Sequence, residues 1–141
     1  MSPKDATAGY SGTPLVKKLG YKAGHRALWL DAPADYPVLL TPLPDNVTIN
    51  FGPAAPPYDI VHLFVASDYA LKRLLPTARA AIGPKGMIWV SWYKQSAKIP
   101  TDVTEDTIRA LALTTDLVDV KVCAVSDIWS GLKLTVRKAA R

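Results

Sequence analysis

Three short runs of apolar residues constrain the fold of this chain more than any other feature. They are Ala27–Leu30, Ile60–Val65 and Met87–Val90, and each is flanked by polar or turn-forming residues. None of them alternates polar with apolar side chains, as a strand does when one of its faces meets water. Continuous apolar strands are typical of a parallel sheet that is covered on both faces. The sequence therefore predicts such a sheet, with Val47–Phe51 as a further strand.

Helix signals lie between and around these strands. The pair Thr13-Pro14 precedes a short apolar stripe, and Ser67 precedes a longer helical pattern. Serine and threonine are favoured N-cap residues, and proline is favoured in the first helical turn. Asp102 with Glu105 three positions later resembles a capping box, which would start a further helix. Helices alternating with buried strands predict a three-layer α/β fold of the Rossmann-like plan.

The C-terminal part of the chain alternates apolar and polar residues, which predicts antiparallel strands at Leu117–Val125 and Trp129–Arg137. If apolar side chains are to share one face, Val120 must pair with Leu134. That register requires a three-residue loop or a β-bulge near Gly131. The sheet is therefore expected to be mostly parallel, with a C-terminal antiparallel hairpin.

The same register sets Lys121 opposite Lys133. A like-charge pair across two strands destabilises a sheet by a few tenths of a kcal/mol when nothing relieves it. In one interpretation both lysines extend into solvent, or Asp119 lies between them. In the other they form a small anion site or a seam for an acidic partner.

Length and residue content favour one domain, with a flexible N-terminal tail at residues 1–12 and a single α/β domain at 13–141. Cys123 is the only cysteine, so no intramolecular disulfide can form, and the two histidines do not suggest a zinc site. The sequence shows neither a signal-peptide pattern nor an apolar stretch of membrane-spanning length. We therefore expect a cytoplasmic protein without a metal.

The charge balance is basic, with 17 Lys and Arg against 12 Asp and Glu and a net charge of +5. The basic residues are scattered along the chain, and no predicted helix carries a basic stripe with interleaved aromatic residues. We therefore expect a basic solvated surface rather than a nucleic-acid interface. The expected partners are a small anion or a protein, and self-association through the terminal hairpin stays open.

Three segments resemble the class I S-adenosylmethionine-dependent methyltransferases. Gly24–Asp31 is similar to their first strand, Tyr58–Phe64 to their fourth strand, and Leu75–Val90 to the helix and strand that follow. The resemblance covers about half of the chain and implies an abbreviated form of their fold. It also implies a cofactor site at closely spaced glycines after the first strand and at an acidic residue after the second.

The chain departs from those methyltransferases at both cofactor positions. Asp31 fits the acidic end of the first strand, but Ala32–Ala34 holds proline and alanine where the family has glycines. Proline lacks an N–H donor, and alanine resists the positive φ that such a turn needs. At the end of the second strand the nearest residues are Asn50 and Gly52, and neither is ionisable. We therefore expect no bound cofactor.

A second resemblance runs from Ser11 to Arg137. It is to a family of small bacterial proteins known only as domain of unknown function 3052. The segments that carry it are Val90–Ser96, Thr101–Glu105, Leu117–Val125 and Trp129–Lys133. This resemblance implies no established activity.

Ligands of open α/β sheets lie beyond the carboxyl ends of the parallel strands. The candidate ligand-binding residues at that edge are Asp31, Ser67, Trp92, Lys94, Ser96 and Lys98. The loop Trp92–Pro100 leads to a helix N-terminus, which with nearby lysines could hold an anion, although Asp102 and Glu105 would oppose it. His62 lies in an apolar strand and is expected to be a hydrogen-bonded core residue rather than a catalytic base.

Together these features predict a methyltransferase-like domain that binds a small anion or a protein partner and carries out no S-adenosylmethionine chemistry. The alternative is an enzyme. It would be a methyltransferase with an altered cofactor loop, or a hydrolase-like protein that uses Lys94 and Ser96 as base and nucleophile.

Overall fold

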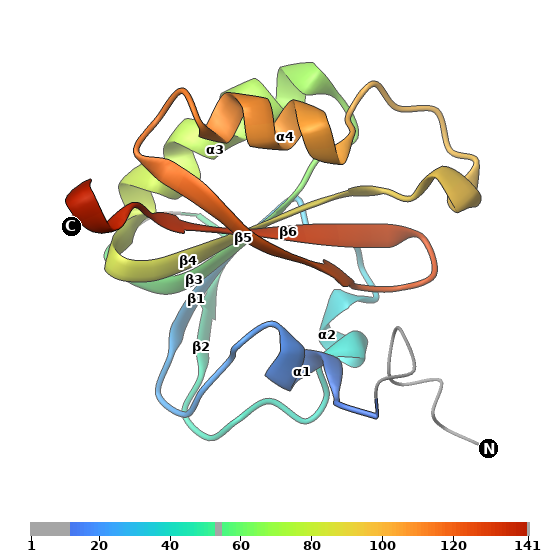
Figure 1. The fold of residues 1–141 in the computed structure, drawn as a ribbon. Coiled ribbons are helices and arrows are strands. Elements are labelled where there is room, and N and C mark those ends of the chain that lie inside the picture. Colours follow the sequence, from blue (N-terminus) through green and yellow to red (C-terminus); the bar gives the residue numbers. More distant parts are fainter. Residues whose placement is uncertain (1–11, 53–54, 141) are drawn as a thin grey trace.

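The computed structural model describes residues 12–52 and 55–140, which form one six-stranded sheet with helices on both faces (Figure 1). The order of the strands across the sheet is β2-β1-β3-β4-β6-β5. They are β1 (Arg26–Leu30), β2 (Thr48–Asn50), β3 (Tyr58–Phe64), β4 (Ile82–Tyr93), β5 (Leu117–Ala124) and β6 (Trp129–Val136). Strands β1 to β4 are parallel, whereas β6 runs antiparallel to β4 and to β5. The predicted fold class is confirmed. The predicted tail at residues 1–12 lies, apart from Gly12, outside the described residues.

The helices form the two outer layers. Four α-helices and two short 3₁₀ turns are described: α1 (Leu15–Lys18), α2 (Tyr36–Leu39), α3 (Asp68–Ala81), η3 (Gln95–Ala97), α4 (Glu105–Ala112) and η4 (Lys138–Ala140). Helices α3 and α4 cover one face of the sheet, and α1 and α2 lie on the other (Figure 1).

The core under α3 and α4 is mainly aliphatic. Strand residues such as Val61 and Val90 meet Leu71 of α3 and Ile108 of α4, and all four side chains are fully buried. The start of α3 is fixed as the sequence predicts, because the Ser67 hydroxyl accepts a hydrogen bond from the Ala70 N–H at 3.1 Å. This cap satisfies one of the free donors of the first helical turn.

The core under α1 and α2 is mainly aromatic. It contains Trp29, Tyr36, Trp89 and Trp129, and each is at least nine-tenths buried. The Trp89 indole N–H donates to the Leu19 carbonyl at 2.8 Å, which holds the end of α1 against β4. The tryptophans expected to pack in the core, Trp29, Trp89 and Trp129, are confirmed there.

The β5–β6 hairpin confirms the predicted opposition of lysines and corrects the place of the register shift. Lys121 lies opposite Lys133, as predicted. That register is regular from Lys121 to the turn, where three residues, 126–128, join the strands and the Val125 N–H donates to the Trp129 carbonyl at 2.9 Å. On the other side of the lysine pair Val120 is an extra residue in β5, so Asp119 rather than Val120 faces Leu134. The prediction of a Val120–Leu134 pair was therefore wrong.

Of the two alternatives predicted for this register, the three-residue loop is confirmed and the bulge near Gly131 was wrong. Gly131 lies in regular register with Ser91 of β4 and Cys123 of β5. A Cβ atom at Gly131 would lie 3.1 Å from a ring carbon of Trp89 and 3.2 Å from Val125. Close packing rather than an irregular backbone therefore explains the glycine.

Candidate functional site

A cleft of about 560 Å³ lies at the carboxyl end of β4, between the exit of that strand and the start of α4. Its walls include Trp92, Tyr93 and Lys94 on one side and Thr104 and Glu105 on the other. This is the edge of the sheet where ligands of α/β folds bind. The cleft is therefore the candidate ligand site.

The β4 wall of the cleft is aromatic and basic. Trp92 is 8% exposed, so its ring forms a nearly immobile surface that still borders the cleft. The Lys94 backbone N–H donates to the Ile128 carbonyl at 2.9 Å, which ties this loop to the β5–β6 hairpin. Lys94 therefore stands at a fixed backbone position on the cleft wall.

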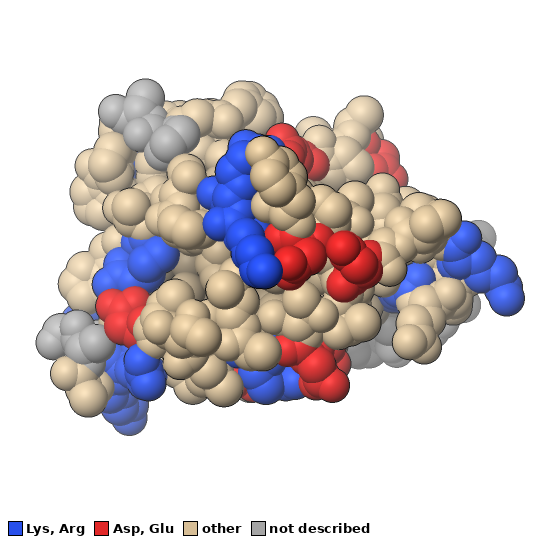
Figure 2. Space-filling view, turned by 90° about the horizontal axis from the view of Figure 1, so that it is seen from above, with Lys and Arg blue, Asp and Glu red and all other residues tan. Residues whose placement is uncertain are grey.

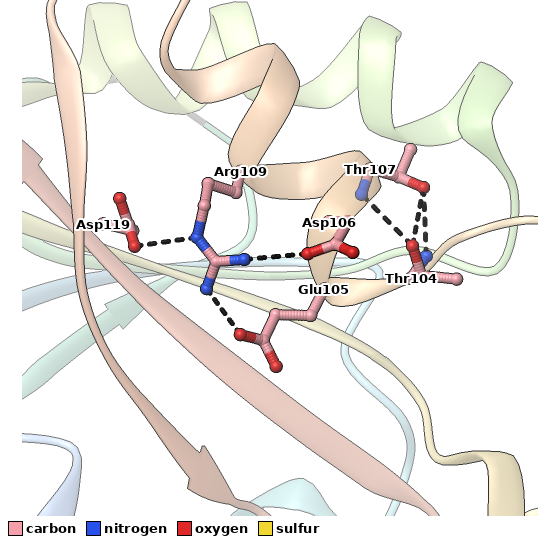
Figure 3. Close-up of polar contacts among 6 residues, drawn as sticks. All are labelled: Thr104, Glu105, Asp106, Thr107, Arg109 and Asp119. Carbon is pink, nitrogen blue, oxygen red and sulfur yellow. Dashed lines mark hydrogen bonds and ion pairs between the residues drawn. The ribbon is translucent and has the colours of Figure 1, made fainter.

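The α4 wall begins with a capping box on residues other than those predicted (Figure 3). The Thr104 hydroxyl accepts from the Thr107 N–H at 3.2 Å, and the Thr107 hydroxyl accepts from the Thr104 N–H at 3.3 Å. The predicted Asp102–Glu105 box was wrong, because Asp102 instead accepts the Asp68 N–H of α3 at 2.7 Å. That contact joins the loop before α4 to the start of α3.

Arg109 gathers three carboxylates at the α4 wall (Figure 3). Its guanidinium donates to Glu105 at 2.5 Å, to Asp106 at 3.0 Å and to Asp119 of β5 at 2.9 Å. The hydrogen bond from Arg109 lowers the pKa of Asp119, and the bond to Glu105 is the main cause that raises the pKa of Arg109. The acids of this wall thus face Arg109, and Lys94 is the cation that borders the cleft.

The structure brings together two of the predicted ligand-binding residues and separates the others from them. Trp92 and Lys94 both line the cleft. Ser96, in η3, and Lys98, which ends that turn with a φ of 55°, belong to the same loop but lie outside the lining. Ser67 caps α3, so its hydroxyl already has a structural partner.

Asp31 lies apart from the cleft, at the end of β1. Its backbone has a φ of 57°, and its carboxylate is 3.9 Å from the Arg73 guanidinium of α3. The chain then turns back at once, because the Tyr36 N–H donates to the Pro33 carbonyl at 3.0 Å. A one-turn helix, α2, follows where the methyltransferase resemblance implies a glycine-rich loop.

The end of β2 also departs from that cofactor site. Asn50 stands at the position of the expected acid, and its amide donates to the Tyr58 hydroxyl at 2.7 Å. Since the β1 turn has no glycine and the β2 end has no carboxylate, these residues do not fit the adenosyl cofactor of the methyltransferases.

A buried chain of polar side chains under α1 and α2 was missed by the sequence reasoning. The Trp29 N–H donates to the Tyr21 hydroxyl, which bonds the Tyr36 hydroxyl at 2.9 Å. Tyr36 bonds His62 Nδ1, and His62 Nε2 bonds the Ser91 hydroxyl at 2.7 Å. His62 is confirmed as a hydrogen-bonded core residue, as the sequence predicted.

Burial controls the ionisation of these hydrogen-bonded side chains. It lowers the pKa of His62 to about 3 and raises the pKa of Tyr21 to about 12. The imidazole is therefore neutral at physiological pH, with one ring nitrogen donating and the other accepting. Both His62 and Ser91 are fully buried, so this serine–histidine contact is closed to a substrate.

Two other features were searched for within residues 12–52 and 55–140. No helix in that part of the chain is both long and apolar enough to cross a membrane. Nor does any group of three or more histidine, cysteine or acidic side chains come together there in a way that suits a metal ion.

Comparison with known proteins identifies the fold and no family. No family model matches the chain, and no curated protein matches it, so the resemblance to the domain of unknown function stays a prediction. Solved structures do match. A SAM-dependent methyltransferase from Aquifex aeolicus is 15% identical with a TM-score of 0.59, over 86% of this chain and 87% of the other.

Two further solved structures are similar at the same level. DhpI in complex with SAH is 12% identical with a TM-score of 0.57, over 89% of this chain and 83% of its own. The O-methyltransferase NcsB1 from neocarzinostatin biosynthesis is 13% identical with a TM-score of 0.58, over 89% of this chain and 53% of its own. At these identities the likeness concerns the backbone alone. The chain has the fold of the SAM-dependent methyltransferases.

Proposed function

We propose that this chain is a methyltransferase-like binding domain that takes a small organic anion in the cleft between β4 and α4 and does not transfer methyl groups. The observation that carries the proposal is the lining of the cleft, in which the aromatic residues Trp92 and Tyr93 are followed directly by Lys94. Aromatic walls with a few polar groups are typical of small-molecule sites.

The charges of the cleft support a single anionic group on a larger apolar body. The N-terminus of α4 offers little to an anion, because Thr104 already accepts the Thr107 N–H and because Glu105 and Asp106 occupy the first turn. Attraction of an anion therefore falls to Lys94. The aromatic wall is suited to an apolar or aromatic body attached to that anion.

The loop after β1 supports the absence of methyl transfer. A backbone that cradles a cofactor needs free N–H groups and glycines, whereas Pro33 has no N–H and its carbonyl closes the turn to Tyr36. Asn50 is already bonded to Tyr58. The Pro33 carbonyl and the Asn50 amide, in the half of the sheet that would hold the cofactor, are thus already hydrogen-bonded within the protein.

The hydrolase-like alternative has less support. Ser96 lies on an exposed 3₁₀ turn outside the lining of the cleft, and its hydroxyl and the Lys94 ammonium make no described contact. A nucleophile and its base must lie within hydrogen-bond reach of each other.

A thermal-shift panel tests the proposal. The probes are S-adenosylmethionine, S-adenosylhomocysteine, inorganic phosphate and phenylacetate, an aromatic carboxylate that matches the cleft in kind. We expect phenylacetate to raise the melting temperature and the two adenosyl compounds to leave it unchanged. A reproducible rise with either adenosyl compound contradicts the proposal.

Two matched variants test whether phenylacetate binds in the cleft. Lys94→Ala should abolish the shift with phenylacetate, and Lys98→Ala, in the same loop but outside the lining, should retain it. Equal loss in the two variants would assign the response to the general charge of the loop. A shift that survives in Lys94→Ala would place the ligand elsewhere on the protein.

A further inference from the structure

The bulge at Val120 separates an acid from a lysine pair. After the bulge, Lys121 pairs with Lys133 in the register that continues to the 126–128 loop. Before it, Asp119 pairs with Leu134 and bonds Arg109 of α4, so it belongs to the α3/α4 face. Without the bulge Asp119 would face Thr135, on the same face as the two lysines. Bulges often serve to redirect a side chain in this way.

Lys133 belongs to the face of β6 that lies on the α1/α2 side. Its neighbours two residues away on the strand, Gly131 and Thr135, share that face, and Gly131 lies against Trp89 of the aromatic core. Lys121 therefore lies beside Lys133 on this side of the hairpin. We name Lys121, Lys133 and Lys22, whose charge also acts on Lys133, the lysine cluster.

The lysine cluster concentrates positive charge. Burial lowers the pKa of Lys133, and the charges of Lys121 and Lys22 lower it further. The nearby Cys123 thiol has a pKa that burial raises, and the charged groups acting on it are Lys18, Lys121 and Lys94. No carboxylate in the described part of the chain forms an ion pair with the three clustered lysines.

The surface around the cluster is open. Helix α4 packs on β5 and β6 from the α3/α4 side, whereas α1 is held over β4 by the Trp89–Leu19 bond. Lys121 is exposed, and Cys123 and Thr135 are half-buried. The two described clefts are lined by other residues, so this surface is a separate site.

We propose that the lysine cluster is a docking surface for an acidic segment of a partner protein. Carboxylates of the partner beside Lys121 and Lys133 would relieve a repulsion that Asp119, turned toward Arg109 by the bulge, does not relieve. Complementary charge of this kind steers association and selects partners.

Three features favour a polypeptide over a nucleic acid. All the basic groups at the cluster are lysines, although arginine is the usual residue for bidentate phosphate recognition. The neutral groups among them, Cys123 and Thr135, offer no aromatic ring on which a base could stack. They form instead a half-buried strip that a peptide can cover.

Fluorescence anisotropy with two labelled probes of equal charge tests this proposal. One is an oligoglutamate peptide and the other an oligothymidylate strand. We expect the peptide to bind at low salt, to weaken as salt rises and to bind more tightly than the oligonucleotide. Tighter binding of the oligonucleotide, or no binding of the peptide at low salt, overturns the proposal.

Two double variants with the same change of charge separate the cluster from the net charge of the protein. Lys121→Ala with Lys133→Ala should weaken peptide binding about tenfold, which corresponds to about 1.4 kcal/mol. Lys85→Ala with Lys138→Ala, at exposed positions outside the cluster, should change it less than about twofold. Equal weakening in both double variants contradicts the proposal. Since removal of a like-charge pair does not destabilise the sheet, folded protein is expected in both cases, and circular dichroism checks it.

Discussion

The face of the sheet under α3 and α4 and the face under α1 and α2 bury side chains of different chemistry. The first is packed mainly by aliphatic groups such as Leu71 and Ile108, which need only volume and shape to fit. The second holds the hydrogen-bonded chain from Trp29 to Ser91, in which each group depends on its neighbours. The second face is therefore the more sensitive to single polar substitutions and to pH.

The surfaces of the two faces differ as well. On the α3/α4 side basic and acidic side chains lie next to one another, as Figure 2 shows from above, and the ion pairs include Lys72–Asp68 and Arg79–Asp116. On the other side the lysine cluster has no carboxylate partner among the described residues. The described ion pairs thus neutralise basic side chains on the α3/α4 side and leave the lysine cluster without such neutralisation.

Lowering the pH should have the largest effect on stability, and this effect should arise on the α1/α2 face. His62 has a folded pKa of about 3 against 6.5 in the unfolded chain, so only the unfolded state takes up a proton between these values. Stability is then lost as the pH falls below 6.5. From about pH 7.5 to about pH 4.5 the free energy of unfolding should fall by about 2 to 3 kcal/mol. Urea titrations at a series of pH values measure this slope.

The ion-paired acids of the α3/α4 face contribute little to the change in stability over this pH range. The pKa values of Asp116 and Asp119 are lowered by hydrogen bonds from Arg79 and Arg109, so these carboxylates take up protons at lower pH. The variant His62→Gln should be less stable at neutral pH and should lack the slope. If it keeps the slope, a different group is responsible, and the comparison between the faces loses its main support.

Removal of one hydroxyl from the buried chain should have the next largest effect. Tyr36→Phe leaves His62 Nδ1 without a partner in the core and leaves the Tyr21 hydroxyl with the Trp29 N–H alone. We expect a loss of about 1 to 2 kcal/mol in the free energy of unfolding, measured by urea denaturation. Tyr69→Phe, at a side chain that is 75% exposed, is the control and should have no effect. If Tyr36→Phe and Tyr69→Phe change the free energy of unfolding equally, the buried hydrogen bonds of Tyr36 add nothing to stability.

The lysines should give the smallest effect, and its sign should differ between the faces. Lys133→Ala removes a like-charge contact and should leave the free energy of unfolding unchanged or raise it by a few tenths of a kcal/mol. Lys72→Ala, on the α3/α4 side, breaks the pair with Asp68 at 2.9 Å and should lower it by about 0.3 kcal/mol. A clear loss of stability in Lys133→Ala would mean that its aliphatic stem contributes more than its charge.

Much of the fold could be predicted from the sequence because its strands carry strong patterns. The apolar runs at Ile60–Val65 and Met87–Val90 correspond to the central strands β3 and β4. Ser67 was a correct N-cap, since serine before a helical stripe has a direct local cause. The opposition of Lys121 and Lys133 was also correct, because the predicted three-residue loop sets that register.

Features that depend on neighbours in space could not be predicted. The alternation of polar and apolar residues in the hairpin gives no sign of the bulge at Val120, and the packing of Gly131 against Trp89 is not visible in the sequence. The buried chain joins Tyr21, Tyr36 and Ser91, which no local pattern connects. At the candidate site, the sequence identified the loop after Trp92. It did not predict the α4 wall of the cleft, because α4 is capped by Thr104 rather than by Asp102.

The single extra residue at Val120 has one more consequence, for the design of the surface. Deleting Val120 would restore an unbroken alternation, because Asp119 would still face Leu134 and Lys121 would still face Lys133. Both charges would keep their faces, and the aromatic and aliphatic interiors would keep their residues. Because the bulge already holds one residue outside the pairing, the edge strand could be shortened there without moving a charge from one surface to the other.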